Sequence, residues 1–452
     1  MEMLQTIVAF IIALGILVTI HEYGHYWVAR RSGVKILRFS VGFGKSLWST
    51  KRGADETEFT LAAIPLGGYV KMLDEREGKV PPELAHRSFN AQSLGTRTAI
   101  VLAGPLANLL FALVVYWAMY LIGVSGPRPI VGEVQAESLA ATAGLQSGEE
   151  IITVNGQVSP TWDNVFRSSI TAILDSGSIV LGVEGAGGGA REIVLNLASI
   201  SVDDLSRGDF FSKVGFEPYR PPIPPKIGRV VNGDPAALAG ILAGDEIVSA
   251  NGKTIDDWIS WVEFIRGSAG RRIEVGLIRD GLLTVVWLTP ETVTSDDETF
   301  GRIGAEVDLT GIEDVPMGIE RYGVIEAMPR AFDRTQEVIS TTLKFIRKMV
   351  LGEASVKNLS GPISIAHYAG QSAKMGLPRF LDFLALVSIS LGILNLLPIP
   401  LLDGGHLMYY LLEFVLRRPV PESIQLAGQQ VGFVLLLGLM GLAVYNDIMR
   451  MM

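Results

Sequence analysis

The sequence predicts a multi-span α-helical membrane protein with four transmembrane helices, a β-hairpin region at the membrane, and two tandem α+β modules inserted on one side. Of its 452 residues, 48% are hydrophobic and only 19% are charged, a balance typical of membrane proteins that carry soluble parts. Four apolar stretches are long enough to cross a bilayer. The polar segment between the second and third stretches repeats itself at an offset of 96 residues, as from Ala143 to Ala239 (239 minus 143).

Composition also excludes several classes of protein. The net charge of −9 lacks the basic surface that nucleic-acid binders need. The chain has no cysteine, which excludes a disulfide scaffold and any thiolate metal site. Because cysteine gives no information on the compartment, the location must be inferred from topology.

The four apolar stretches justify the four helices. The first covers residues 3–20 and continues to residue 29, without the basic start and small-residue cleavage site of a secretory signal. The other three stretches cover residues 98–124, 380–397 and 426–445. Each has about the 20 apolar residues that a transmembrane helix needs.

Basic residues give the orientation of these helices. Arg417 and Arg418 follow the third stretch, and seven Lys and Arg residues follow the first: Arg30, Arg31, Lys35, Arg38, Lys45, Lys51 and Arg52. Such loops stay in the cytoplasm. We therefore expect a bacterial inner-membrane protein whose termini and long middle segment are periplasmic, with an active site nearer the cytoplasmic face.

The first stretch ends in His21-Glu22-Tyr23-Gly24-His25, an H-E-x-x-H pattern. On a helix, His21 and His25 share one face and can bind the same metal ion. Glu22 lies beside them, where a general base takes a proton from water. Ionisable side chains at membrane depth are costly unless they are paired or bind a metal. The pattern predicts a zinc hydrolase site inside the membrane.

Residues 35–72 read as short strands, at 39–44 and 58–62, with a turn at 65–69. An ordinary cytoplasmic hairpin is one interpretation. The other is a strand edge that pairs with an extended substrate beside the zinc site. In that case close backbone approach is permitted by four glycines, which we predict to bind substrate: Gly42, Gly44, Gly67 and Gly68.

The second stretch contains Gly104-Pro105 and, three residues later, Asn108. Proline frees a backbone carbonyl, and glycine permits a close contact between helices. An asparagine in an apolar helix needs a hydrogen-bond partner. We expect Asn108 to hold helices together, and contact with the active site is the alternative.

The repeated segment carries the pattern A-G-[LI]-x-x-G-[DE]-E-I-x-x-x-N-G twice and resembles circularly permuted PDZ domains. The resemblance predicts a strand at 150–154, an Asn-Gly hairpin, and a helix near Trp162 or Trp258 in each copy. Residues 221–225, rich in proline, are predicted to be a stiff linker. Peptide-carboxylate loops are predicted at Val131, Gly132, Ile227 and Gly228.

Residues 330–351 have apolar positions at helical spacing, interleaved with Lys and Arg. This pattern predicts an amphipathic helix on the membrane surface. A helix packed on the second PDZ-like copy is the alternative.

The third stretch ends in Asn395-Leu-Leu-Pro-Ile-Pro-Leu-Leu-Asp403-Gly-Gly-His406. Two prolines and two glycines predict a break in the helix at membrane depth, which is tolerated only around a cavity. A site with two histidines needs a third protein ligand, and the Asp403 carboxylate is best placed to supply it. His406 is then a structural residue or a neighbour of a ligand.

Together these motifs resemble the site-2 protease family of intramembrane zinc metalloproteases, and in particular its bacterial members that act on anti-sigma factors. The resemblance covers nearly the whole chain. It implies one Zn²⁺ held by His21, His25 and Asp403, catalysis by Glu22, and an Asn395 side chain that holds unwound substrate. It also implies the substrates: single-span anti-sigma factors already clipped outside the membrane, and remnant signal peptides.

We expect five parts in the chain: residues 1–125 with two helices and the β region, PDZ domains at 126–221 and 222–309, an amphipathic region at 310–379, and the last two helices at 380–452. Two other functions would fit parts of this pattern. A catalytically idle PDZ scaffold in the membrane would keep a structural metal, and a zinc transporter would also place histidines and carboxylates in its spans. Neither explains Glu22.

Overall fold

The computed structural model describes residues 2–451 except 77, 176, 186, 202–203, 206–208, 296–297, 311–313, 354 and 356–359. The chain forms two compact units. The first unit comprises residues 1–129, 134–216 and 318–452, and the second comprises 130–133 and 217–317.

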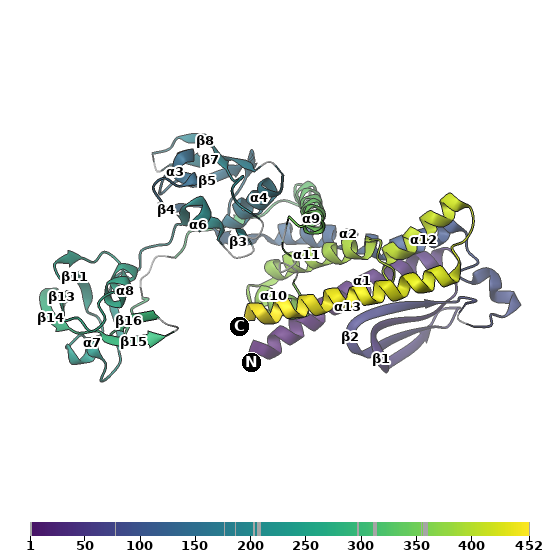
Figure 1. Ribbon diagram of the computed structural model, residues 1–452, viewed down its shortest axis with the longest axis horizontal. Helices are drawn as coiled ribbons and strands as arrows, with labels where there is room; N and C mark the ends of the chain where they lie inside the picture. The colour runs from purple at the N-terminus through teal and green to yellow at the C-terminus, as the bar shows by residue number, and fades with distance from the viewer. Residues whose placement is uncertain are drawn as a thin grey trace. The chain divides into compact units, whose positions relative to one another are not determined.

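Among the described residues, four helices are long and apolar enough to cross a membrane: α1 (Glu2–Arg31), α2 (Leu94–Ile122), α11 (Leu377–Leu396) and α13 (Glu422–Met451) (Figure 1). They confirm the four predicted helices. The helix α1 begins one residue before the predicted stretch and the other three begin three or four residues before, because hydropathy marks the apolar middle of a helix and not its polar cap. At the start of α2, for example, the Ser93 side chain accepts a hydrogen bond from the Thr96 amide.

The predicted break after the third span is confirmed, because α11 ends at Leu396 and α12 (Asp403–Leu416) begins seven residues later. Between them lie Pro398 and Pro400, and Leu401 has a φ of +95°. The helix α12 was not predicted, because its 14 residues are too few to span a bilayer and gave no separate signal. The helix α10 (Pro362–Lys374) was missed for the same reason.

Two long antiparallel strands, β1 (Ile36–Arg52) and β2 (Thr57–Met72), form the predicted β region. The turn expected at 65–69 is wrong, since these residues lie within β2. Val41 of β1 lies opposite both Leu61 and Gly68 of β2. The two halves of β2 therefore pair with opposite edges of β1, and the residues between these halves cross from one edge to the other with irregular pairing. The proline and glycines at residues 65–69 therefore form an irregular bend inside a strand and not a loop between two strands.

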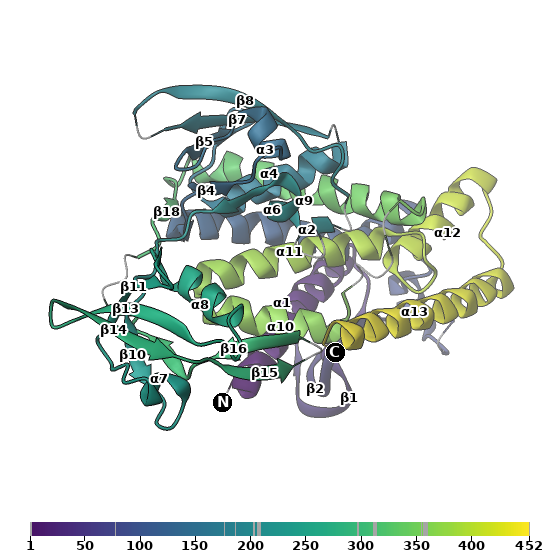
Figure 2. The same cartoon turned by 60° about the vertical axis from the view of Figure 1, so that its left-hand side comes forward.

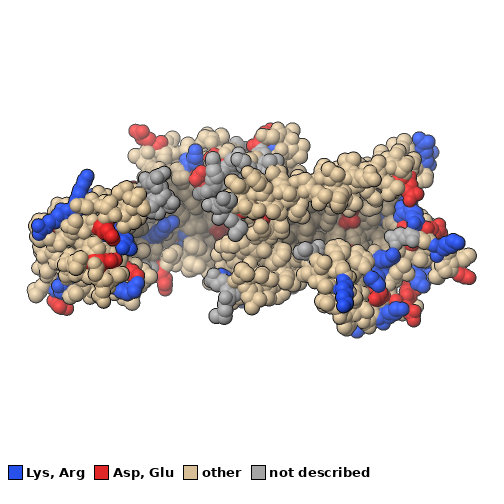
Figure 3. Space-filling view, turned by 60° about the horizontal axis from the view of Figure 1, so that its bottom comes forward, with Lys and Arg blue, Asp and Glu red and all other residues tan. Residues whose placement is uncertain are grey.

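The helix α2 is the centre of the first unit, and it packs against α1 on one side and α11 on another (Figure 2). One buried cluster joins α2, α9 and α11, with Tyr116 and Ile389 fully covered. A second joins α1, α10 and α11 around Leu17. Within the first unit, charged side chains are sparse over the helices and gather near α12 and the β1–β2 hairpin (Figure 3), as expected for spans in lipid.

The predicted amphipathic helix is α9 (Ala327–Val350). It packs against α2, α11 and α4, all in the first unit. The alternative of a helix that packs on the second repeat copy therefore finds no support in its described contacts.

The two repeat copies have four-stranded sheets of the same order. The first has the order β6-β5-β7-β8, and the second has β12-β11-β13-β14. Their bounds are β5 (Glu150–Val154), β6 (Gln157–Val158), β7 (Ser178–Glu184), β8 (Ala190–Asn196), β11 (Glu246–Ala250), β12 (Lys253–Thr254), β13 (Ile273–Arg279) and β14 (Leu282–Leu288). The helices near Trp162 and Trp258 are α4 (Trp162–Asp175) and α8 (Trp258–Arg266).

The predicted Asn-Gly hairpins are present in both copies. Asn155 and Asn251 have φ angles of 48° and 49°, which asparagine tolerates better than most residues. The Oδ1 atom of Asn155 accepts a hydrogen bond from the Val180 amide at 2.9 Å, and that of Asn251 accepts one from the Glu274 amide at 2.8 Å.

Shorter elements complete the chain. They are η1 (Pro82–Arg87), β3 (Val124–Pro127), β4 (Val131–Val134), α3 (Leu139–Ala143), α6 (Phe210–Val214), β9 (Phe216–Pro218), β10 (Ile227–Val230), α7 (Pro235–Leu238), β15 (Glu291–Ser295), β16 (Glu298–Arg302), β17 (Ala305–Val307) and β18 (Met317–Glu320).

The residues predicted to form carboxylate loops do not lie in loops. Val131 and Gly132 belong to β4, and Ile227 and Gly228 belong to β10. Val131 and Ile227 are fully buried core side chains. The two glycines mark close contact between strands, because a Cβ on Gly228 would lie 2.6 Å from the Val307 carbonyl oxygen.

Candidate active site

The three side chains predicted to bind metal lie together in the first unit. His21 and His25 are one turn apart on α1, and Asp403 is the first residue of α12. The Nε2 atoms of the two histidines are 3.2 Å apart. The Oδ2 atom of Asp403 lies 3.2 Å from Nε2 of His21 and 3.4 Å from Nε2 of His25. These three atoms therefore form a nearly equilateral triangle.

The triangle has the size that a zinc ion requires. Zinc binds nitrogen and oxygen at about 2.0–2.1 Å in a tetrahedron, which sets neighbouring ligand atoms about 3.3–3.4 Å apart. The Oδ2 atom of Asp403 is buried and makes no hydrogen bond among the described atoms. Lone pairs that converge in a buried place need a cation between them. The donor set thus fits Zn²⁺.

The other ring nitrogen of each histidine also suits metal binding. Nδ1 of His25 lies 2.8 Å from the Ile100 carbonyl oxygen and donates to it, which leaves Nε2 as a lone pair. Nδ1 of His21 lies 3.3 Å from the side-chain amide of Asn108. Asn108 is fully buried and its Oδ1 has no partner in the described structure. Asn108 therefore joins α2 to α1 through a side-chain hydrogen bond, as expected, and because its partner is a predicted metal ligand it also contacts the predicted active site.

Two glycines make room for the histidines between α1 and α2. A Cβ on Gly24 would lie 2.3 Å from the Ala103 carbonyl oxygen, so this glycine lets the helices touch. A Cβ on Gly104 would lie 2.3 Å from Nε2 of His25 and 2.9 Å from Cε1 of His21. Gly104 thus leaves open the space that the imidazoles occupy, a role that the sequence alone did not reveal.

A cavity of about 450 Å³ surrounds the triangle. Glu22 lies on its wall, and the backbone of Val70 hydrogen-bonds to its carboxylate. Asn395 and His406 line the same cavity. One whole strand segment also forms part of the wall: Gly68, Tyr69, Val70, Lys71 and Met72. The cavity thus combines the three donors, the Glu22 carboxylate and a strand.

Of the four glycines predicted to bind substrate, only Gly68 lines this cavity. Gly42 and Gly67 instead permit contacts within the β1–β2 sheet, with the Ala62 and Ile64 carbonyls and with the Phe43 ring. Tyr69, Arg76 and Tyr410 line the cavity and were missed, because none belongs to a spaced motif.

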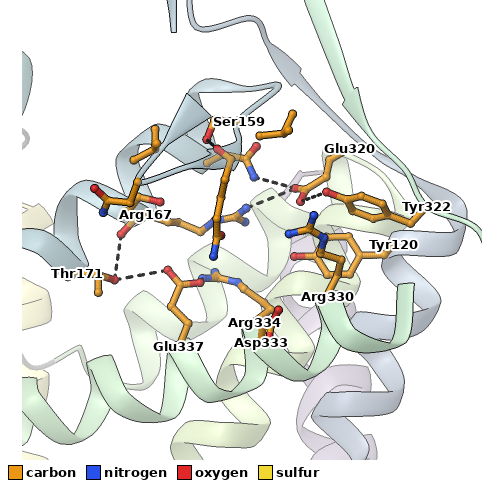
Figure 4. A pocket seen from close by; sticks show the side chains of 16 residues that line it. Tyr120, Ser159, Arg167, Thr171, Glu320, Tyr322, Arg330, Asp333, Arg334 and Glu337 are labelled. Carbon is orange, nitrogen blue, oxygen red and sulfur yellow. Dashed lines mark hydrogen bonds and ion pairs between the residues drawn. The ribbon is translucent and has the colours of Figure 1, made fainter. Parts of the chain in front are cut away.

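A second cavity, of about 230 Å³, lies between α4, α9 and β18 and is shown in Figure 4. Glu320 lines it and accepts hydrogen bonds from Asn164 at 3.0 Å and Tyr322 at 3.3 Å, with Arg167 at 3.5 Å. Nearby, Lys344 of α9 pairs with Asp175 of α4. These contacts attach the first repeat copy to the helices of the first unit.

Comparison with known proteins assigns this site to a family. The sequence model described as peptidase family M50 matches residues 9–439. The chain belongs to peptidase family M50. Members of M50 are site-2 proteases, and the converging donors agree with a zinc metalloprotease of this type. With four apolar helices, this M50 protease is a multi-pass membrane protein whose cofactor is zinc.

Relatives extend over the full chain. The chain is 40% identical over 453 residues to the regulator of sigma-E protease RseP of Escherichia coli, with 100% of both chains covered. It is 41% identical over 453 residues to protease RseP of Yersinia pestis, again with 100% of both covered. A Vibrio cholerae protein provisionally named a zinc metalloprotease is 40% identical over 455 residues, with the same coverage.

Proposed function

We propose that this protease hydrolyses a peptide bond within the transmembrane segment of single-span membrane proteins, with His21, His25 and Asp403 as zinc ligands and Glu22 as the catalytic base. The observation that carries the proposal is the triangle of donor atoms, 3.2–3.4 Å on each side, beside the Glu22 carboxylate. His21, Glu22 and His25 lie in a helix that is long and apolar enough to cross a membrane, and Asp403 follows the end of another such helix.

The residues of the chain divide the chemistry between them. Zinc, when bound, supplies Lewis acidity that lowers the pKa of a water and polarises a carbonyl group. Glu22 takes the proton of the attacking water and passes it to the leaving amine. Asn108 and the Ile100 carbonyl hold the two imidazoles in the tautomer that presents Nε2.

Substrate binding has to expose a peptide bond that a transmembrane helix keeps in its own hydrogen bonds. The segment 68–72 of β2 lines the cavity, and a substrate unwound into a strand can pair with it. Asn395 on the same wall is placed to bind the unwound backbone through its side-chain amide. Gly42, Gly44 and Gly67 act only indirectly, by shaping this hairpin.

The biological role follows from the relatives. Proteins named for regulation of sigma-E share about 40% of their residues with this chain over its full length. We therefore assign to this protease a pre-clipped anti-sigma factor as substrate, in envelope stress signalling, with remnant signal peptides as a second class. We also propose that this protease lies in the inner membrane, with its termini and repeat copies in the periplasm and the active site toward the cytoplasm, an orientation that the basic loops after the first and third spans support.

The two repeat copies are assigned as PDZ domains at 126–221 and 222–309, between helical parts at 1–125 and 380–452 and the region 310–379 with α9. The equal strand order of their sheets supports this division. Two roles are open to them. They exclude substrates that have bulky outer domains, or they capture the carboxyl terminus that clipping creates.

One experiment tests the proposal. The purified full-length chain is incubated in detergent with a tagged single-span peptide, before and after zinc is removed by a chelator. We expect cleavage by the zinc-loaded protein, loss with the chelator, and recovery when zinc is added back. Absence of cleavage by fully loaded protein would contradict the proposal and leave the idle scaffold as the better account. Zinc uptake into proteoliposomes would favour a transporter.

A further inference from the structure

The position of Asp403 depends on the short loop that precedes it. Residues 397–402 join α11 to α12 and are held by local backbone hydrogen bonds, from Ile399 N to Leu397 O at 2.7 Å and from Leu402 N to Ile399 O at 3.0 Å. Leu401 has a φ of +95°, which side-chain-bearing residues rarely adopt. A loop this short transmits any displacement of Pro400 directly to Asp403.

The last span, α13, contacts this loop through two glycines one turn apart. A Cβ on Gly432 would lie 2.0 Å from the carbonyl oxygen of Pro400 and 3.2 Å from its Cβ. A Cβ on Gly428 would lie 2.1 Å from the hydroxyl oxygen of Tyr409 and 3.6 Å from Cγ of Pro400. Both glycines therefore leave space that the Asp403 loop and α12 fill.

The other two glycines of α13 make no such contact. Gly438 and Gly441 lie further along the same helix, and a Cβ on either would meet nothing within 4 Å. Only 17% of the apolar window of α13 is buried inside the structure. The far end of α13 approaches another segment as well, where Asp447 accepts a hydrogen bond from the Gly361 amide at 2.9 Å, but no glycine of α13 takes part in that contact. Among the four glycines of α13, only Gly428 and Gly432 therefore meet another segment.

We infer that Gly432 and Gly428 are positioning residues for the metal centre, because they let α13 brace the Pro400 loop and so hold Asp403 against the two histidines. This inference rests on the proposed function, which makes Asp403 a zinc ligand. Neither glycine touches the donor atoms or the cavity around them. Their effect on zinc acts entirely through Pro400 and Tyr409.

The two glycines have different expected effects. In Gly432→Ala the methyl group meets a backbone carbonyl, so the loop itself must move and Asp403 moves with it. In Gly428→Ala the methyl group meets the end of a side chain. The Tyr409 hydroxyl is buried and has no hydrogen-bond partner among the described atoms, so Tyr409→Phe removes the clash without breaking a bond and is expected to rescue Gly428→Ala.

The test measures metal binding directly in the full-length chain in detergent. Apoprotein is titrated with zinc in competition with a chromophoric chelator, and its Co²⁺ complex is recorded by visible absorption, which reports the coordination geometry. For Gly432→Ala we expect zinc affinity to fall roughly 10- to 100-fold, as for loss of an outer contact of a metal ligand, with a changed Co²⁺ spectrum. The zinc affinity of Gly428→Ala is expected to fall less, and that of the double variant Gly428→Ala/Tyr409→Phe is expected to return to the parental value.

Gly438→Ala and Gly441→Ala are the matched controls and should bind zinc as the parent does. Unchanged affinity in Gly432→Ala, equal loss in the controls, or no recovery in the double variant would each overturn the inference. Asp403→Ala is measured alongside to separate the two levels of the argument. If Asp403→Ala binds zinc as the parent does, the proposed function fails. If Asp403→Ala loses zinc but Gly432→Ala binds it as the parent does, the proposed function stands and this inference fails.

Discussion

The side-chain amide of Asn108 lies 3.3 Å from Nδ1 of His21. In the proposed zinc site the lone pair of Nε2 of His21 binds the metal, so Nδ1 carries the proton and has to donate it. The structure places Nδ2 of Asn108 nearest to Nδ1, so the amide group has to be turned over for Oδ1, the atom that otherwise has no partner among the described atoms, to accept this proton. Asn108 therefore fixes both the tautomer and the orientation of the His21 ring.

We expect Asn108→Ala to weaken zinc binding roughly 10- to 100-fold, because the His21 ring loses the group that orients it. Asn108→Asp keeps an acceptor and should retain most of the affinity. Ser388→Ala is a control, since the Ser388 hydroxyl donates only to the Asn108 backbone carbonyl at 2.8 Å. Chelator competition measures all three, and full affinity in Asn108→Ala would refute the role.

Gly104→Ala should prevent zinc binding in a folded protein. The added methyl group would lie 2.3 Å from Nε2 of His25, so the ring has to turn away from the triangle. Metal analysis of the purified variant should find less than about a tenth of the zinc of the parent, given the loss of one of three protein ligands. Gly95→Ala near the start of the same helix meets nothing within 4 Å, and a comparable loss there would discredit the explanation.

In the second repeat copy, Arg279 donates to Asp245 at 2.6 Å and to the Gly240 carbonyl at 2.7 Å. Arg191 makes the equivalent contacts with Glu149 and Gly144 in the first copy. We expect Arg279→Ala to destabilise the second copy by about 1–3 kcal/mol, because Asp245 is left buried and charged. Hydrogen exchange of β11 and β13 measures this, and unchanged protection would contradict it.

The same pair gives a pH dependence. Burial acts to raise the pKa of Asp245, but hydrogen bonds from Arg279 and Leu242 outweigh it, so the pKa lies below its ordinary value. A lowered folded-state pKa adds stability above the unfolded value of about 3.9 and loses it as pH falls through the folded pKa. The hydrogen-exchange protection of β11 in the parent should therefore decrease once the pH is lower than about 4, and it should decrease less in Arg279→Ala. If protection changes with pH in the same way in both proteins, the Arg279–Asp245 pair does not cause the pH dependence.

The two roles proposed for the repeat copies predict different results when residues 127–308 are deleted. As a size filter, the copies block bulky substrates, so the deletion should allow cleavage of an unclipped substrate. As a capture device, they bind clipped termini, so the deletion should reduce cleavage of clipped substrate and gain none on the intact one. Cleavage of matched clipped and unclipped single-span proteins in cells separates these outcomes, and the second result would contradict the filter hypothesis.

Local patterns predicted the parts of this protein that depend on one helix or one loop. His21 and His25 share a face because helical geometry places residues i and i+4 together, and the four spans follow from hydropathy. Asp403 was predictable because a helix that breaks at membrane depth has to line a cavity, and a metal site with two histidines needs a third ligand. These features require no knowledge of which helices touch.

Features that depend on contacts between distant segments could not be predicted. Gly104 and Asn108 stood out in the second apolar stretch, but the side chains that they meet, His25 and His21, follow only from the approach of α1 to α2. The crossing of β2 at residues 65–69 looked like a turn, because proline and glycine give the same signal in a bulged strand. Val131 and Ile227 were predicted to lie in loops, but they belong to the strands β4 and β10 and are fully buried.

The most direct test of the account compares zinc content and peptide cleavage in purified Glu22→Gln. The amide keeps the shape of the side chain but cannot take a proton from water, and it is not one of the three donors. We predict that the variant binds one zinc per chain, as the parent does. Its rate of cleavage of a tagged single-span peptide should be about 10²- to 10⁴-fold lower than that of the parent. Cleavage at the parental rate by the zinc-loaded variant would contradict the account.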